Sequence, residues 1–155
     1  MSELDEQMEE VAKFFAGQIK GAHDVQMASA LDRSRLDFSL DSLRAVDRWL
    51  GHLHEAGADV SDPQTAESVV WAGAYVGEVI RRNSERQFGW LPYEAYMATQ
   101  EEKLRRMIPY TFGTQFILAD ANGGMTLPIN KVCRWLDEGP ENDLHFYASC
   151  DMKSK

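Results

Sequence analysis

The side chains of this chain that offer the most chemistry lie in one hydrophobic stretch, WAGAYVGEVIRRN, at residues 71–83. Glu78 follows Gly77 there among apolar residues. A carboxylate buried in such surroundings has a raised pKa and can act as a general base or anchor a ligand. It can equally pair with Arg81 or Arg82, which follow it by three and four residues on a helix. We favour the ion pair, and Glu78 is the acid to test first.

A small-ligand-binding or hydrolytic site around this stretch is the alternative that remains open. Its wall would be built from polar and aromatic side chains on or near the stretch, namely Tyr75, Glu78, Arg82 and Trp90. Gly73 and Gly77 remove side chains from one stripe of the helix, so a ligand or another backbone can approach closely. Glycine inside a helix costs about 1 kcal/mol relative to alanine, so we favour compensation by tight packing.

Other residue types that carry chemistry lack the spacing that chemistry requires. His52 and His54 are two residues apart, which directs them to different faces of a helix, whereas helical zinc ligands are spaced by four. Cys133 lies in a helical apolar pattern, which favours a core residue over a nucleophile. The glycine-rich fingerprints of nucleotide sites and the G-x-S-x-G fingerprint of hydrolases do not occur. We therefore predict no catalytic residue, no metal ligand and no cofactor, and favour a protein that is not an enzyme.

Charge is distributed unevenly along the chain. The formal net charge is −9; residues 1–80 carry 15 acidic side chains against 6 Lys or Arg, and residues 81–155 carry 10 of each. An acidic surface repels nucleic acids and anionic lipids and attracts a basic protein, so we expect no nucleic-acid partner, no membrane and possible docking of a basic protein. The acids expected to form this docking surface are Glu6, Glu9, Asp41 and Asp47. Acidity that serves solubility alone is the competing explanation.

Length and composition indicate one folded domain. A chain of 155 residues with 44% hydrophobic residues can bury a core of its own. Two cysteines are too few for a disulfide framework, which favours a reduced, cytoplasmic protein. The chain opens with acidic residues instead of the basic and apolar residues of an export signal, so we expect none. No run of about 18 uncharged apolar residues occurs, so no membrane-spanning segment is expected.

The first element that the sequence predicts is an amphipathic helix within residues 1–20. Leu4, Met8, Val11 and Phe15 recur at steps of three and four residues, and Gly21 should end the helix. We expect the apolar stripe to dock on the chain's own body or on a second copy, and the second case would make a dimer through this helix. Oligomeric state otherwise stays open, and residues 21–35 read as a loop or short helix.

The main body is expected over residues 35–150. A helix capped by Ser39 should end at Gly57, and Asp62 with Pro63 should open a second helix that runs to about residue 82. This helix, 63–82, contains the glycines, is the most hydrophobic and should lie in the centre.

The second half of the main body mixes strands and helices. We expect strands at 87–91, 111–119 and 125–127, the last two joined by a turn at DANGG. Further helices are expected at 93–107, from Pro128 to Gly139, and at 143–150. Together these elements predict an α+β fold, with four or more helices around a small antiparallel sheet.

The order of these segments carries a family resemblance. The succession LDFSLDSLRAVDRWL, WAGAYVGEVIRRN, Trp90 and FILADANGGMTLPINKVCRWLDEG resembles a family of small bacterial domains of unknown function. Its members share the order of a capped helix, a glycine-containing helix, a Trp-bearing strand and a hairpin that leads to a helix. The resemblance covers residues 35–150 and implies a similar fold without naming a substrate. In size and charge the chain is also similar to bacterial immunity proteins, which neutralise toxins of competing bacteria.

Overall fold

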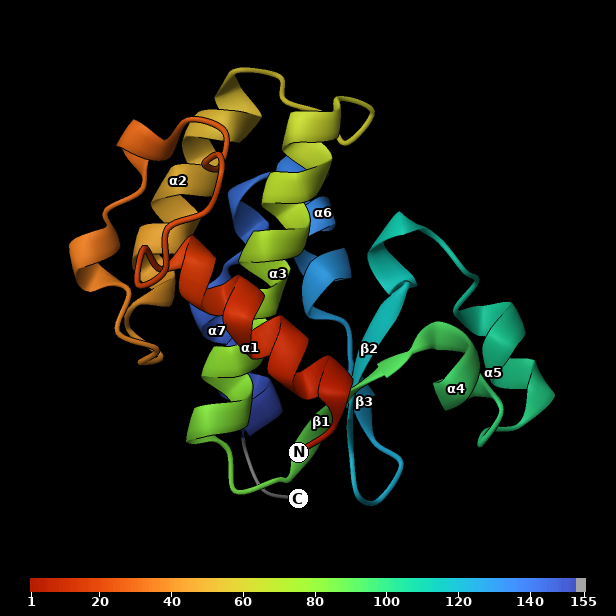
Figure 1. The fold of residues 1–155 in the computed structure, drawn as a ribbon. Coiled ribbons are helices and arrows are strands. Elements are labelled where there is room, and N and C mark those ends of the chain that lie inside the picture. The colour runs from red at the N-terminus through yellow and green to blue at the C-terminus, as the bar shows by residue number, and fades with distance from the viewer. Residues whose placement is uncertain (153–155) are drawn as a thin grey trace.

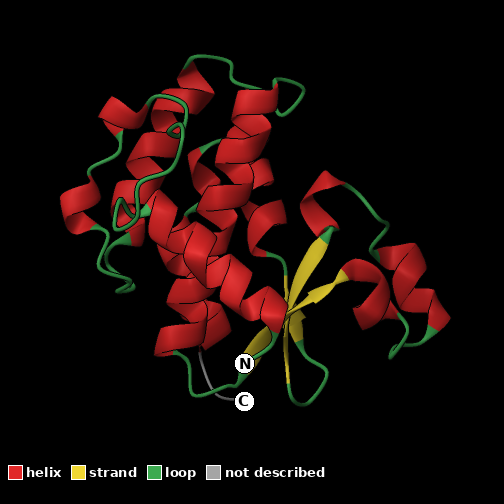
Figure 2. Ribbon diagram, viewed as in Figure 1, coloured by secondary structure: helices red, strands yellow, loops and turns green. Residues whose placement is uncertain are grey.

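A computed structural model describes residues 1–152 of the chain. Helices dominate the fold, and a small sheet joins them (Figure 2). The helices are α1 (Glu3–Phe15), α2 (Leu43–Glu55), α3 (Pro63–Asn83), α4 (Tyr93–Met97), α5 (Glu102–Met107), α6 (Pro128–Glu138) and α7 (Leu144–Met152). The strands are β1 (Phe88–Pro92), β2 (Phe116–Asp120) and β3 (Met125–Thr126). Single 3-10 turns lie at Ala28–Ala30, Arg33–Arg35, Phe112–Thr114 and Pro140–Asn142.

The three strands form one antiparallel sheet in the order β1-β2-β3. Trp90 of β1 pairs with Leu118 of β2, and Leu118 pairs on its other side with Thr126 of β3. The turn at residues 120–124 joins β2 to β3, and Gly123 there has a φ of +85°, which glycine adopts at no steric cost. The predicted hairpin and the predicted α+β fold are both confirmed.

Helix α3 lies in the middle of the helical part of the molecule, with α1 crossing it and α2, α6 and α7 around it (Figure 1). Every residue of α3 from Ala72 to Ile80 is buried, which confirms the prediction of a central helix. Its glycines serve packing, because a Cβ on Gly73 would overlap Ile129 of α6 and a Cβ on Gly77 would overlap the Trp90 ring of β1.

The sheet is covered on both faces. Trp90 and Leu118 belong to the large hydrophobic core shared with α1, α2, α3, α6 and α7. Ile117 and Ala119 point the other way and form a smaller core with side chains of α4. The alternation of neighbouring residues between two cores is what a strand buried on both faces requires. Helices α4 and α5 therefore lie beyond the sheet, away from α2 (Figure 1).

The N-terminal helix docks on its own chain. Met8, Ala12 and Phe15 of α1 are buried against α3, so the apolar stripe is already covered within one copy. The helix ends at Phe15 and not near Gly21 as predicted. Gly17 has a φ of +79°, a left-handed conformation typical of the residue that terminates a helix, and its N–H donates to the Phe14 carbonyl.

Two further predicted boundaries are wrong because local side chains compete with regular structure. The segment 93–107 is two helices, since residues 98–101 turn and the Thr99 hydroxyl donates to the Tyr96 carbonyl. The strand predicted from residue 111 starts at residue 116, because the Thr111 N–H donates to the Thr114 hydroxyl and a 3-10 turn replaces extended chain.

The start of α2 also differs from the prediction. The helix begins after Ser42, while the hydroxyl of Ser39, the expected cap, accepts the Ser42 N–H in the preceding turn. The predicted end holds, because Gly57 follows α2 with a φ of +72°. Across residues 1–152, none of the helices is both long and apolar enough for a membrane crossing.

Candidate functional site

Glu78 lies in an ion pair. Its side chain is 2% exposed, and a terminal nitrogen of Arg81 donates to Oε1 at 2.5 Å. Arg82 approaches the other carboxylate oxygen at 4.0 Å. Burial raises the pKa of Glu78 above its ordinary value, although the positive charge and hydrogen bond of Arg81 act against that rise. Arg81 also donates through Nε to the Phe88 carbonyl, so the pair links α3 to β1.

The other residues of the predicted ligand site, Tyr75, Arg82 and Trp90, pack against neighbouring side chains and backbone of the chain. The Tyr75 hydroxyl accepts the Phe38 N–H at 3.0 Å and is hydrogen-bonded to the hydroxyl of Ser42 at 2.6 Å. The Arg82 guanidinium lies over the Phe38 ring, 3.7 Å from its centre. Trp90 packs on the opposite side of α3, against Gly77. Tyr75 and Arg82 thus share the neighbour Phe38, Arg82 also approaches Glu78, and Trp90 packs elsewhere. None of the four side chains lines either of the two cavities described below.

Asp5 completes the charged cluster, and sequence reasoning missed it. Its Oδ1 accepts the Trp90 N–H at 2.7 Å, its Oδ2 accepts the Ser2 N–H at 3.1 Å, and Arg81 lies 3.8 Å away. Burial would raise the Asp5 pKa, but the hydrogen bonds from Trp90 and Ser2 and the charge of Arg81 outweigh it, and the pKa is lowered. The spacing of Ser2 and Asp5 is a helix-cap signal; nothing local indicated the contact with β1.

The four acids expected on the docking surface lie in different environments. Glu6 is exposed. Glu9 is partly buried between Lys13 at 3.3 Å and Arg82 at 3.8 Å. Asp41 is exposed and pairs with Arg44, its neighbour on the next turn, at 3.0 Å.

Asp47 faces inward and does not belong to an acidic surface. Its Oδ1 accepts the indole N–H of Trp135 and the backbone N–H of Leu144, each at 2.9 Å, so it ties α2 to α6 and α7. The pKa of Asp47 is raised to about 6, because burial and the nearby charge of Asp143 together outweigh the hydrogen bonds from Leu144 and Trp135, which lower it. Helical spacing places residue 47 next to buried Val46, at the border of the apolar face, which explains why sequence alone did not resolve its orientation.

Acidic side chains on α1 form a continuous exposed row. Glu3, Glu6 and Glu10, which we call the acidic stripe, follow one another at steps of three and four residues and are all exposed. Within residues 1–152 none of their carboxylates forms an ion pair. A cleft of about 290 Å³ lies beside the stripe, lined by Met1, Glu6, Glu9, Glu10, Lys13 and Ile19.

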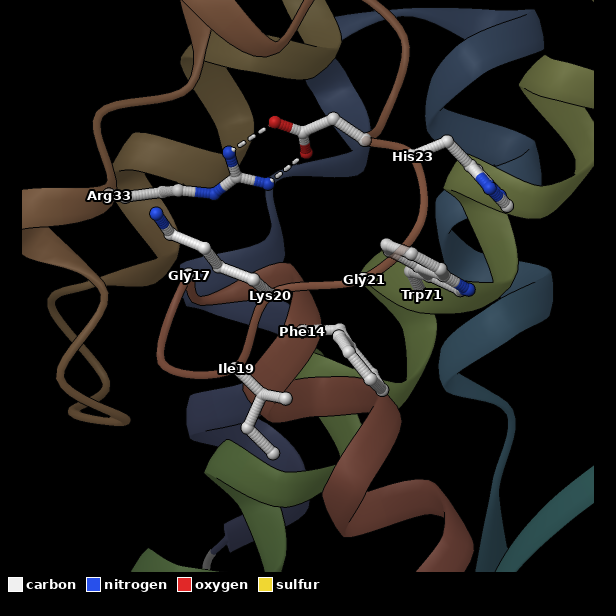
Figure 3. A pocket seen from close by; sticks show the side chains of 9 residues that line it. Phe14, Gly17, Ile19, Lys20, Gly21, His23, Arg33 and Trp71 are labelled. Atoms are coloured by element: carbon white, nitrogen blue, oxygen red, sulfur yellow. Dashed lines mark hydrogen bonds and ion pairs between the residues drawn. The ribbon is translucent and has the colours of Figure 1, made fainter.

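A second cavity, which we call the loop cavity, lies where α1 ends (Figure 3). Its volume is about 410 Å³, and it is lined by Phe14, Gly17, Ile19, Lys20, Gly21, His23, Asp24, Arg33 and Trp71. Sequence reasoning did not find it, because it placed residues 16–20 in the first helix and found no clear periodicity in residues 21–35. The available signals were two glycines four residues apart, Gly17 and Gly21, and a bulky Trp71 in a helix of mostly small residues.

Comparisons with protein-family models, with curated proteins and with solved structures find no significant match to this chain. The resemblance to small bacterial domains and the likeness to immunity proteins therefore stay predictions. Functional argument rests on the geometry of the chain itself.

Proposed function

We propose that this protein is a non-enzymatic interaction module that binds a basic protein through the acidic stripe on α1. The observation that carries the proposal is a row of three exposed glutamates, Glu3, Glu6 and Glu10, without an ion-pair partner within residues 1–152. Unpaired charges of one sign on one helix face produce a local field that attracts an oppositely charged surface.

Several other acids in the first half of the chain are already used locally. The carboxylates of Asp32, Asp37, Asp59 and Asp62 each accept a backbone N–H two residues further along. Asp24 pairs with Arg33, and Asp41 with Arg44. Among the acidic residues of 1–80, those on α1 are therefore the most available for binding a partner.

The cleft beside the stripe has the composition that a long cationic side chain prefers. Met1 and Ile19 supply apolar contacts, and Glu6 and Glu10 supply carboxylates without an ion-pair partner in residues 1–152, while Lys13 in the cleft is paired with Glu9. A lysine or arginine of the partner could lay its aliphatic stem on the apolar part and its charged end among the carboxylates. Such an anchored side chain is typical of residues that dominate interface energies.

The stripe is presented on a helix that needs no further ordering. The opposite face of α1 is buried on α3, and Asp5 holds its first turn to β1. A surface that is rigid before binding loses less conformational entropy in the complex. A basic toxin is one class of partner that would fit, and immunity is the function that this partner would imply.

The test compares association rates of charge-reversal variants. The full chain is used to capture basic proteins from its source cell at low salt, and each captured protein is purified and measured by surface plasmon resonance. We expect the triple variant Glu3→Lys, Glu6→Lys, Glu10→Lys to slow association about tenfold or more at low salt. We expect the difference to fade near 1 M salt, where the Debye length is about 3 Å.

The matched control changes the same amount of charge elsewhere. Glu101, Glu102 and Asp137 are exposed on other elements, and reversing all three to lysine should leave the association rate near that of the wild type. Glu78→Gln should also leave it unchanged, because Glu78 is buried. Equal slowing by the stripe variant and the control would show that only net charge matters and would contradict docking on α1.

A further inference from the structure

The loop cavity has the size of a small-molecule site. Pockets that hold small ligands typically have volumes of roughly 300–1,000 Å³, and this cavity measures about 410 Å³. It lies between the end of α1, the loop that follows it and the exposed edge of α3 (Figure 3). It plays no part in the docking surface described above apart from the shared side chain of Ile19.

One wall of the cavity is rigid and polar. Arg33 donates through Nε to the Phe15 carbonyl at 3.0 Å, and its two terminal nitrogens donate to the Asp24 carboxylate at 2.8 and 2.5 Å. The Arg33 side chain packs directly on Gly17, and a larger residue would clash there, because a Cβ on Gly17 would lie 2.8 Å from Arg33 Cδ. Three hydrogen bonds therefore hold the guanidinium in place.

The opposite wall is aromatic. Phe14 and Trp71 stack with ring centres 5.8 Å apart, and the His23 ring stacks on Trp71 at 5.9 Å. Trp71 is partly exposed, although the residues that follow it in α3 are buried. Side-chain contact between His23 and Glu67 holds the imidazole in this position. Exposed aromatic surface gathered at one cavity favours a planar apolar group.

The polar wall of the cavity carries a net charge of one positive side chain, that of Lys20. Asp24 compensates Arg33, whereas Lys20 is exposed and forms no ion pair within residues 1–152. The Lys20 amine lies on the Arg33 side of the cavity, across from Phe14 and Trp71 (Figure 3). In the described structure the backbone N–H groups of residues 19–24 donate to no protein acceptor. Lys20 is therefore the one cation on this wall without an ion-pair partner within residues 1–152.

We propose that the loop cavity binds a small planar aromatic carboxylate, with its carboxylate at Lys20 and its ring against Phe14 and Trp71. One uncompensated cation matches a single negative charge. Asp24 lines the cavity and Glu67 lies beside it in contact with His23, and their carboxylates would repel a second negative charge. A charge-assisted hydrogen bond to Lys20 and burial of the ring on two aromatic side chains are the two contributions to affinity.

The test uses 1-naphthoate as the probe and 1-naphthalenemethanol as its neutral counterpart. We expect isothermal titration calorimetry to show saturable binding of 1-naphthoate to the full chain, in the low millimolar range or tighter, and much weaker binding of the alcohol. Lys20→Gln should weaken 1-naphthoate binding about tenfold, the loss that removal of one charged hydrogen-bond donor causes. Lys103→Gln, on exposed α5, is the matched control and should bind like the wild type.

NMR spectroscopy of the wild-type chain provides a second test, because it shows which residues the bound probe contacts without any substitution in the core. Probe-induced shifts in the amide resonances of Gly17 and Gly21 and in the indole resonance of Trp71 are expected in heteronuclear NMR spectra. His23→Ala, at an exposed position, should weaken binding without unfolding the chain. No saturable binding, equal binding of the acid and the alcohol, or shifts confined to other residues would each overturn the proposal.

Discussion

Asp5 and Asp47 have the same structural task at two junctions of this fold, but burial affects them differently. Asp5 joins α1 to β1 by accepting the Trp90 N–H, and Asp47 joins α2 to α7 by accepting the Leu144 N–H. The pKa of Asp5 is lowered, while that of Asp47 is raised to about 6. Desolvation is the largest influence on both carboxylates, so their other neighbours decide the outcome.

The surroundings of the two carboxylates explain the difference. Asp5 accepts N–H groups on both oxygens and has the Arg81 guanidinium 3.8 Å away. Asp47 accepts two N–H groups on one oxygen, and Asp143 adds a second negative charge nearby. Hydrogen bonds therefore do not keep the half-buried Asp47 carboxylate acidic, whereas at Asp5 the hydrogen bonds from Trp90 and Ser2, with a smaller contribution from Arg81, outweigh burial.

The largest expected effect comes from removing that cation. Arg81→Met leaves Glu78 and Asp5 without their shared partner, and we expect the free energy of unfolding at pH 7 to fall by about 3–5 kcal/mol. Without Arg81 the pKa of Glu78 should rise further above its ordinary value, so the variant should regain part of its stability as pH falls from 7 to 5. Urea denaturation at both pH values measures this.

Arg44→Met is the matched control for that experiment, because Arg44 pairs with Asp41 at an exposed position. Removing an exposed pair should change stability by no more than about 1 kcal/mol. A loss in Arg81→Met as small as the loss in Arg44→Met would show that the buried ion pairs of Arg81 contribute no more to stability than an exposed pair.

A smaller effect is expected from Asp5→Ala, which leaves the Trp90 N–H without its acceptor. We expect a loss of about 2–3 kcal/mol at pH 7, the cost of a buried unsatisfied donor, and a smaller loss for Asp5→Asn, which keeps an acceptor oxygen. Because the pKa of Asp5 is lowered on folding, its contribution is present above the unfolded value and disappears as pH falls through the folded value. Guanidinium denaturation should therefore show the wild type and Asp5→Ala converging at acid pH; a constant gap would contradict the lowered pKa.

The smallest effect in this comparison is expected from Asp47→Asn. An asparagine retains the acceptor for Trp135 and Leu144 but cannot ionise. Because the pKa of Asp47 rises from 3.8 to about 6 on folding, its contribution is present below pH 3.8 and disappears as pH rises through 6. The stability of Asp47→Asn relative to wild type should therefore increase by on the order of 2 kcal/mol between pH 4 and 7, allowing for partial solvation.

Thermal unfolding across that pH range measures the Asp47 effect, and Asp47→Ala provides the contrast. The alanine variant loses both hydrogen bonds and should be less stable than the asparagine variant at every pH. Identical pH profiles for wild type and Asp47→Asn would mean that Asp47 is not desolvated.

Local patterns in the sequence predicted most of the elements. Helical periodicity and the pair Asp62 and Pro63 located α3, and the turn residues at 120–124 located the hairpin. The pairing of Glu78 with Arg81 was also local, because residues three apart on a helix are neighbours. At residues 98–101 and 111–114, two of the places where these predictions failed, hydrogen bonds between side chains and the backbone interrupted a regular pattern.

The sequence by itself determined the α+β composition, the central position of α3 and the acidic character of α1, since these depend on residue type and on spacings of two to four residues. Only the tertiary structure decided that Asp5 binds a strand 85 residues away, that Asp47 turns inward to Trp135 88 residues away, and that the loop cavity forms beside Trp71. Contacts at such separations depend on how elements pack in space, because packing brings together side chains that no local pattern relates.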